Sequence, residues 1–174
     1  MNSPNSFGLF VRLGQKTKGA FYFHIGVNNM NEYDSIKIPF NDFMQGNYEE
    51  GERNLYIVWM GEKCLYVGIA RTSIHDRWFN SRSHHYGPYG SLVGRAIYLN
   101  KPDSLSWEIE MLHVHNDLEF YEESLIYNLK PLFNSTHNNA ERTQQEREEE
   151  TKLYNTLLWG NENHYSNAGV ILPR

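Results

Sequence analysis

The sequence predicts an α/β (α+β) fold in which helices flank a small central antiparallel β-sheet, preceded by an N-terminal β extension. Residues 54–60 and 63–69 are rich in aromatic and β-branched side chains and are separated by a tight turn, the pattern of a β-hairpin. Apolar and acidic side chains alternate within residues 105–114, as they do in a β-strand. Residues 118–129 carry apolar side chains at helical spacing, so a helix follows that strand.

Short strands are also expected before the hairpin. Residues 7–13 and 20–27 are apolar and are joined by a polar turn, and residues 35–40 alternate in polarity. The polar and acidic residues 41–53 then join these strands to the main domain. We therefore expect the N-terminal β extension to cover residues 1–53.

The segment after the hairpin is expected to be helical. Thr72 or Ser73 can cap a helix that runs as far as Arg82. The glycines and the proline of residues 83–90 must end that helix. Residues 92–99 are predicted to form a second, short helix.

Helices are also expected in the last third of the chain. The helix over residues 118–129 stops before a proline. A further helix is expected over residues 140–159, with its acidic residues 146–150 on a solvated face. On this basis residues 54–134 form the main domain, and residues 135–174 form a C-terminal helical extension.

The composition favours a small cytoplasmic protein with no membrane partner. At 174 residues, the chain fits one domain with a small appended element. Cys64 is the sole cysteine, which excludes an intramolecular disulfide framework and a cysteine-cluster zinc site, and its apolar neighbours indicate a buried thiol. No apolar run reaches the ~20 residues that a membrane span needs. The polar N-terminus lacks the apolar segment of a signal peptide.

The charges are unevenly distributed along the chain. The formal net charge of -5 argues against a general nucleic-acid-binding surface. From Lys63 to Lys101, however, six Lys or Arg residues accompany a single acid, Asp76. From Glu108 to Glu123 six carboxylates then follow without one Lys or Arg. A basic stretch beside an acidic one can hold a polyanion and a metal together.

Short motifs lie on the predicted hairpin and on the helices that follow. The first strand reads Asn-Leu-Tyr-Ile-Val from Asn54, and the second contains Tyr66-Val67-Gly68. Arg77 follows that glycine by nine residues, inside the next predicted helix. Glu122 begins an E-x-x-L-I frame in the helix after the third strand. That frame runs on into K-P-x-x-N, which ends at Asn134.

In their order and spacing these motifs resemble those of the GIY-YIG endonuclease family over residues 54–134. The chain departs from the family pattern in three ways. Asn54 and Leu55 stand in place of Gly and Ile, Arg77 falls one residue later than the commonest spacing, and Ser81 replaces a histidine. The resemblance implies metal-dependent hydrolysis of phosphodiester bonds in DNA, leaving 5′-phosphate and 3′-hydroxyl ends.

The resemblance places the tyrosines of the two motifs, Tyr56 and Tyr66, in the catalytic site. They lie on adjacent strands at the same relative face, so their hydroxyls can converge. We expect Tyr56 to activate water and Tyr66 to orient water or phosphate. A tyrosine is a poor base unless nearby cations lower its pKa, and Lys63, Arg71 and a metal-bound water could do so.

The resemblance also assigns one arginine and one carboxylate to the site. Arg77 would present its guanidinium fork to the scissile phosphate. Glu122 would be the single carboxylate ligand of Mg²⁺ or Mn²⁺, with water and phosphate oxygens in the remaining positions. Glu123 is offset by ~100° on the helix and should face solvent. Asn134 is expected to brace the site by hydrogen bonding rather than to touch the substrate.

Histidines and further cations complete the expected site. One of His75, His84 and His85 can take the role of the missing helix histidine, either as a proton donor to the leaving group or as a phosphate contact, and we favour His84 or His85. The expected nucleic-acid-binding set is Lys63, Arg71, Arg82 and Asn134, of which Asn134 is expected to act mainly by bracing the site.

Two hypotheses from different classes follow. The first is a restriction-type or phage-defence nuclease acting on DNA, with the N-terminal strands as a target-reading or dimerising surface; RNA stays open as a substrate. One site cuts one strand, so double-strand cleavage would call for a homo-oligomer or two encounters. The alternative is a catalytically silent domain of the same fold that binds nucleic acid or protein.

Overall fold

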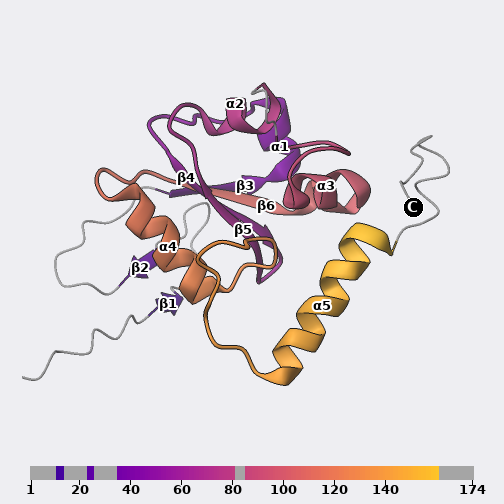
Figure 1. Cartoon of the computed structure of the whole chain (residues 1–174). Coiled ribbons are helices and arrows are strands. Elements are labelled where there is room, and N and C mark those ends of the chain that lie inside the picture. Colours follow the sequence, from indigo (N-terminus) through magenta and orange to yellow (C-terminus); the bar gives the residue numbers. More distant parts are fainter. Residues whose placement is uncertain (1–10, 14–22, 26–34, 81–84, 161–174) are drawn as a thin grey trace, which may run out of the picture.

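A computed structural model of the chain describes residues 11–13, 23–25, 35–80 and 85–160 (Figure 1). Its centre is a four-stranded antiparallel sheet in the order β3-β6-β4-β5, and two further strands, β1 and β2, pair with each other. The central strands are β3 (Ser35–Pro39), β4 (Leu55–Met60), β5 (Lys63–Ile69) and β6 (Glu108–Leu112). The separate pair consists of β1 (Val11–Leu13) and β2 (Phe23–Ile25). The predicted mixed class with a central antiparallel sheet is thus confirmed.

Five α-helices surround the central sheet in the described part of the chain. They are α1 (Phe40–Gln45), α2 (Ile74–Phe79), α3 (Leu92–Leu99), α4 (Leu118–Leu129) and α5 (Gln144–Trp159). A 3-10 turn, η1 (Asp103–Ser106), precedes β6. The predicted hairpin and the predicted α3 and α4 are confirmed. No helix in the described residues is both long enough and apolar enough to cross a membrane.

The β4–β5 hairpin forms because both of its strands are buried on both faces. All β4 side chains except the last are buried, which explains why this strand is continuously apolar rather than alternating. The turn places Gly61 at a φ of 58°, a conformation that favours glycine. The register pairs Tyr56 with Gly68 and Val58 with Tyr66, and an irregularity follows Val58.

The sheet separates two apolar clusters. Tyr56, Val58 and Met111 face the larger cluster, which α1, α2, α3 and α5 complete. Leu55 and Ile57 face the smaller cluster, to which α4 contributes. Cys64 lies in this second cluster, so the prediction of a buried thiol is confirmed, and burial raises its pKa.

The domain boundary expected at residue 53 does not correspond to a break in the packing. β3 pairs with β6 along its whole length, from Ser35 opposite Leu112 to Pro39 opposite Glu108. The helix α1, which the sequence did not predict, brings Phe40 and Phe43 into the larger cluster with no exposed surface. The stretch 41–53 is therefore part of the main domain rather than a join. The C-terminal helix α5 likewise shares this cluster through its buried leucines.

Several predicted element ends were wrong. α2 ends at Phe79 instead of Arg82, and Arg82 lies outside the described residues. α5 begins after Thr143 rather than at Ala140, because the Thr143 side chain and Glu146 form a reciprocal capping box. The strand predicted over residues 105–114 is shorter, because η1 occupies its first part. Of the strands predicted at 7–13 and 20–27, only residues 11–13 and 23–25 lie within the described part.

A buried carboxylate occupies the middle of the sheet. Glu110 of β6 has no exposed surface, and one of its oxygens accepts a hydrogen bond of 3.0 Å from Trp59 Nε1. Its other oxygen is buried with no hydrogen-bond partner among the described residues. Burial is the largest effect on its pKa, which rises to about 7 and is only partly lowered again by Trp59 and Lys37.

We expect Glu110→Gln to stabilise the protein at alkaline pH. Because the pKa is raised on folding, the unfolded chain loses this proton first, and the free energy of unfolding falls as pH rises from about 4.5 to about 7. The glutamine variant lacks that loss, so its advantage should grow to the order of 2–3 kcal/mol by pH 8. Urea unfolding of both proteins from pH 5 to pH 8 measures this difference. A constant difference across that range would contradict it.

Candidate active site

Two tyrosines, one arginine and one histidine converge on the face of the sheet that carries α2. Tyr56 of β4 and Tyr66 of β5 lie with their ring centroids 6.0 Å apart. Arg77 of α2 donates a hydrogen bond from Nε to the Tyr56 hydroxyl at 3.3 Å and to His85 Nε2 at 3.0 Å. The His85 ring packs against both tyrosines and Trp78. Four of the residues that the sequence proposed for the site, Tyr56, Tyr66, Arg77 and His85, therefore lie together.

The glycine of the second motif leaves room for this cluster. Gly68 lies opposite Tyr56 in the strand register. A Cβ at this position would come within 2.6 Å of the Tyr56 hydroxyl oxygen and 2.7 Å of the Tyr66 ring. The motif thus reflects a close approach of the two rings to the β5 backbone.

The short helix α2, which carries Arg77, is held by a residue that the sequence did not single out. Glu50 accepts hydrogen bonds from the Ile74 and His75 backbone N–H groups at 2.5 and 3.3 Å and from the Ser73 hydroxyl at 3.0 Å. Ser73 caps the same helix through the Asp76 N–H. A carboxylate at a helix N-terminus satisfies free backbone donors and opposes the helix dipole. Glu50 thereby fixes the position of Arg77.

His85 does not fit the predicted role of proton donor. It is 8% exposed, its Nε2 accepts the Arg77 hydrogen bond, and its Nδ1 lies 2.9 Å from Ser91 Oγ. Burial, followed by the charge of Arg77, lowers its pKa to about 4, so the ring is neutral at physiological pH. His85 is therefore a positioning residue for Arg77. Of the other two candidates, His84 lies outside the described residues, and His75 packs against Phe79.

Burial also changes the roles of the tyrosines. Tyr56 has no exposed surface, and burial raises its pKa more strongly than Arg77 lowers it. Tyr66 is only partly buried; burial raises its pKa too, and Arg77 again opposes the rise. The expectation that Tyr56 activates water does not fit this arrangement, because solvent does not reach it. Tyr66 is the tyrosine that solvent reaches.

A solvent-open pocket of about 650 Å³ borders the cluster. It brings together Arg77 of α2 and Glu122 of α4, two residues that are distant in the sequence. Burial raises the pKa of the half-buried Glu122, and Arg77 opposes that rise. Glu123, by contrast, is exposed, as predicted, with one carboxylate oxygen 3.5 Å from His137 Nδ1. The complete lining is Ile69, Ala70, Arg71, Thr72, Asp76, Arg77, Asn80 and Glu122.

The donor set of this pocket fits a divalent cation held by one carboxylate. Within the described residues no three His, Cys, Asp or Glu side chains gather closely enough to form a metal site on their own. Glu122 is nevertheless a carboxylate whose charged form is disfavoured by burial, and a cation beside it would relieve that cost. Mg²⁺ commonly uses one or two carboxylates together with water and substrate phosphate.

Arg71 lies in the pocket as expected, whereas Lys63 does not. Arg71 is largely exposed and forms an ion pair of 2.8 Å with Glu119 of α4. Lys63 lies at the hairpin end of β5, opposite Met60, and pairs with Glu150 of α5 at 2.8 Å. The prediction that Lys63 lowers the tyrosine pKa and contacts nucleic acid is therefore not supported by its position.

Asn134 braces β5, as the sequence suggested. Its side chain accepts a hydrogen bond of 2.9 Å from the Val67 N–H and donates one of 2.9 Å to the Val67 carbonyl. Val67 is the residue between Tyr66 and Gly68. Asn134 thus occupies the edge of β5 in place of a neighbouring strand and fixes the backbone that carries Tyr66.

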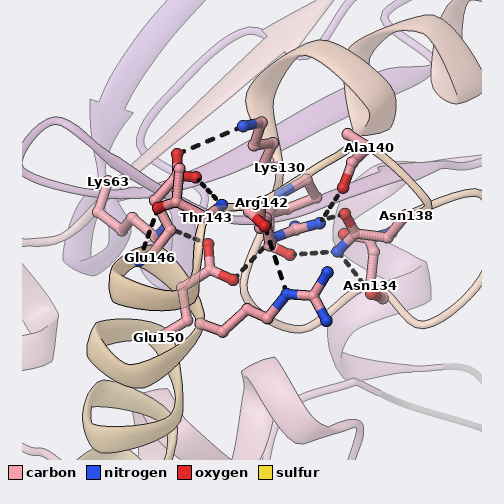
Figure 2. A network of polar contacts seen from close by, with 11 residues as sticks. Lys63, Lys130, Asn134, Asn138, Ala140, Arg142, Thr143, Glu146 and Glu150 are labelled. Carbon is pink, nitrogen blue, oxygen red and sulfur yellow. Dashed lines mark hydrogen bonds and ion pairs between the residues drawn. The ribbon is translucent and has the colours of Figure 1, made fainter.

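A polar network anchors this brace to α5 (Figure 2). Asn138 donates to the Asn134 carbonyl at 2.9 Å, and Arg142 donates to Asn138 at 2.6 Å and to Glu150 at 2.8 Å. Glu150 therefore joins Arg142 and Lys63, and its side chain is only 19% exposed. The acidic face of α5 was predicted to be solvated, but its Glu150 forms ion pairs with Lys63 and Arg142. The pair with Lys63 connects α5 to β5, the strand that carries Tyr66.

Comparisons with protein-family models, curated proteins and solved structures gave no match. What the chain does must therefore be inferred from the geometry of its own residues.

Proposed function

We propose that this protein is a metal-dependent endonuclease of the GIY-YIG type that hydrolyses phosphodiester bonds in DNA, as a cytoplasmic restriction-type or phage-defence enzyme. One observation carries the proposal. Arg77, held by Tyr56 and His85, shares a solvent-open pocket with Glu122, and the Tyr66 ring packs against His85. A fixed guanidinium and a carboxylate facing one pocket suit a phosphate and its counter-ion.

Each residue has a definite task in this proposal. Arg77 binds the scissile phosphate and stabilises the charge that develops on it in the transition state. Tyr56 and His85 hold the Arg77 guanidinium, and the neutral His85 adds no competing positive charge. Tyr66 orients the attacking water through its hydroxyl, and the charge of Arg77 opposes the rise that burial causes in the Tyr66 pKa.

Glu122 would hold the divalent cation, Mg²⁺ or Mn²⁺. When bound, this cation would supply positive charge to the phosphate and the leaving oxygen. Arg71 lies across the same pocket and would contact the backbone of the substrate strand.

A catalytically silent binding module is the second candidate function. The burial of Tyr56 and the raised pKa values of both tyrosines favour it, because neither hydroxyl ionises readily in the free protein. Such a module would bind DNA or another polyanion at Arg71 and Arg77 without cutting it.

Incubation of the full chain with supercoiled plasmid separates the two candidates. We expect conversion to the nicked and linear forms with Mg²⁺ or Mn²⁺ and none with a chelator. A parallel reaction with structured RNA tests the substrate class. Absence of cleavage of either nucleic acid with both metals, together with retained DNA binding, would favour the silent module.

Tyr66→Phe is expected to lower the cleavage rate by about 100-fold, the usual worth of a positioned acid–base group. Tyr56→Phe removes only one of the hydrogen bonds that hold Arg77, so a loss of about 10-fold or less is expected. Single-turnover rates and melting temperatures of both variants measure the difference. The reverse order of effects would return the water-activating role to Tyr56.

A further inference from the structure

Exposed apolar and basic side chains gather on α3 and the turn before it. Five large hydrophobic side chains are exposed in the described part of the chain, and three of them, Tyr89, Leu92 and Trp159, belong to this region. Arg95 of α3 lies over the Trp159 ring at 4.8 Å, which brings the end of α5 beside α3. We call these four residues the α3 surface.

The stretch from Arg77 to Pro102, which contains Tyr89, Leu92 and Arg95, carries positive charge only. From Arg77 to Pro102 there is no Asp or Glu, whereas four Arg or Lys residues occur in the same stretch. Lys101 lies over the Tyr86 ring at 4.9 Å, a second pairing of a cation with an aromatic ring. The α5 residues around Trp159 also lack acids, because the carboxylates of α5 lie in its first half. A protein of net charge -5 thus presents here a local surface that suits a polyanion.

The turn that carries Tyr89 is firmly attached to the candidate active site. The His85 carbonyl accepts hydrogen bonds from the Ser91 N–H at 3.0 Å and from the Ser91 hydroxyl at 3.3 Å. A Cβ on Gly90 or Gly94 would come within 2.0 or 1.7 Å of that same carbonyl oxygen, so only glycine permits this packing. The turn therefore closes on His85, the residue that positions Arg77.

Tyr89 projects from this closed turn with 87% of its surface exposed. Three residues lie between it and His85, so the two Cα atoms lie within about 14 Å of each other at full extension. A few nucleotides of one DNA strand span that distance. An exposed aromatic ring on a fixed turn can stack on any base, and a guanidinium over a ring can still donate from its edge to phosphate.

We infer that the α3 surface binds the DNA strand beside the cleavage site, with Tyr89 stacking on a base and Arg95 contacting phosphate. This inference rests on the proposed function for the identity of the strand, but it concerns binding and not the chemical step. It predicts an affinity that tolerates changes of sequence and depends strongly on salt.

The test measures binding of the full-length Glu122→Gln protein to labelled single-stranded and duplex DNA by fluorescence anisotropy. In this background Tyr89→Ala should raise Kd by about 10-fold, and Tyr89→Phe should restore it to within about two-fold. Arg95→Gln should reduce the slope of log Kd against log salt by about one. The matched control is Tyr127→Ala on α4, an aromatic that is also exposed and should leave Kd unchanged.

Each outcome decides the inference independently of cleavage. DNA binding that depends on Tyr89, together with no cleavage by the unmodified protein, would support the α3 surface and refute the nuclease. Cleavage and binding that are unaffected by Tyr89→Ala would refute the α3 surface and leave the nuclease intact. Dissociation of a dimer by Tyr89→Ala in sedimentation, with unchanged DNA affinity, would show instead that this surface joins two copies.

Discussion

Arg77→Lys is expected to lower the cleavage rate by about 100- to 1,000-fold, which is the cost of losing a well-placed donor to a developing oxyanion. Arg77 donates from Nε to both the Tyr56 hydroxyl and His85 Nε2, so the plane of its guanidinium is fixed by these two neighbours. A lysine ammonium keeps the charge but cannot hold both neighbours and a phosphate in one plane. Single-turnover cleavage at saturating DNA measures this loss, and Kd should change far less.

Arg71→Lys is the matched control for this prediction. Arg71 lines the same pocket, but it is largely exposed, and its ion pair with Glu119 requires no planar fork. We expect a loss of less than about 10-fold, seen mainly in binding. If Arg71→Lys proves the more damaging change, Arg71 is the arginine of the transition state, and Arg77 belongs to the scaffold.

The sequence predicted the elements whose apolar residues repeat with a clear period. α4 is of this kind, whereas the hairpin was predicted from two aromatic and β-branched runs on either side of a tight turn. α1 was missed because only Phe40 and Phe43 anchor it, and they lie beside a polar and acidic stretch. The domain boundary was wrong for a related reason: the pairing of β3 with β6 joins segments about 70 residues apart, which no local pattern reveals.

The membership of the candidate site was more predictable than the roles within it. Tyr56 and Tyr66 share a face because strand side chains alternate, so their approach follows from spacing. Which of them meets solvent depends on Trp78 and His85, which cover Tyr56 from other parts of the chain. The pKa of His85 likewise follows from burial and from the Arg77 charge, and neither is visible in the sequence.

The residues that hold other side chains in place could not be predicted, because no motif distinguishes them from their neighbours in the sequence. Glu50 caps α2 from more than 20 residues away, and in the sequence it is one acid of an acidic stretch. Arg142 similarly stands among exposed charged residues before α5. Its contacts with Asn138 and Glu150 span four and eight residues, across the loop before α5 and the first turns of that helix. Polar residues of this kind act through single specific contacts rather than through a repeating face, so periodicity carries no signal for them.

Glu122→Gln is expected to reduce cleavage by about 1,000-fold or more while preserving the fold and DNA binding. Glu122 is one of two carboxylates that line the pocket with Arg77, the other being Asp76, and a neutral amide of the same shape binds a divalent cation far more weakly. A loss of about 1,000-fold corresponds to about 4 kcal/mol, which is within the several kcal/mol that a catalytic cation contributes.

The raised pKa of Glu122 allows the effect on stability to be separated from the effect on chemistry. Because burial disfavours its charged form, the folded protein gains stability as pH falls below the folded pKa, and at neutral pH a neutral glutamine should not lower the melting temperature. Plasmid cleavage, Mn²⁺ titration by calorimetry and thermal melting, all on one preparation, make the comparison. Glu123→Gln, on the exposed side of α4, should behave as the unmodified protein in all three. Cleavage by Glu122→Gln at an unchanged rate, or an unchanged affinity for Mn²⁺, would remove Glu122 from the metal site.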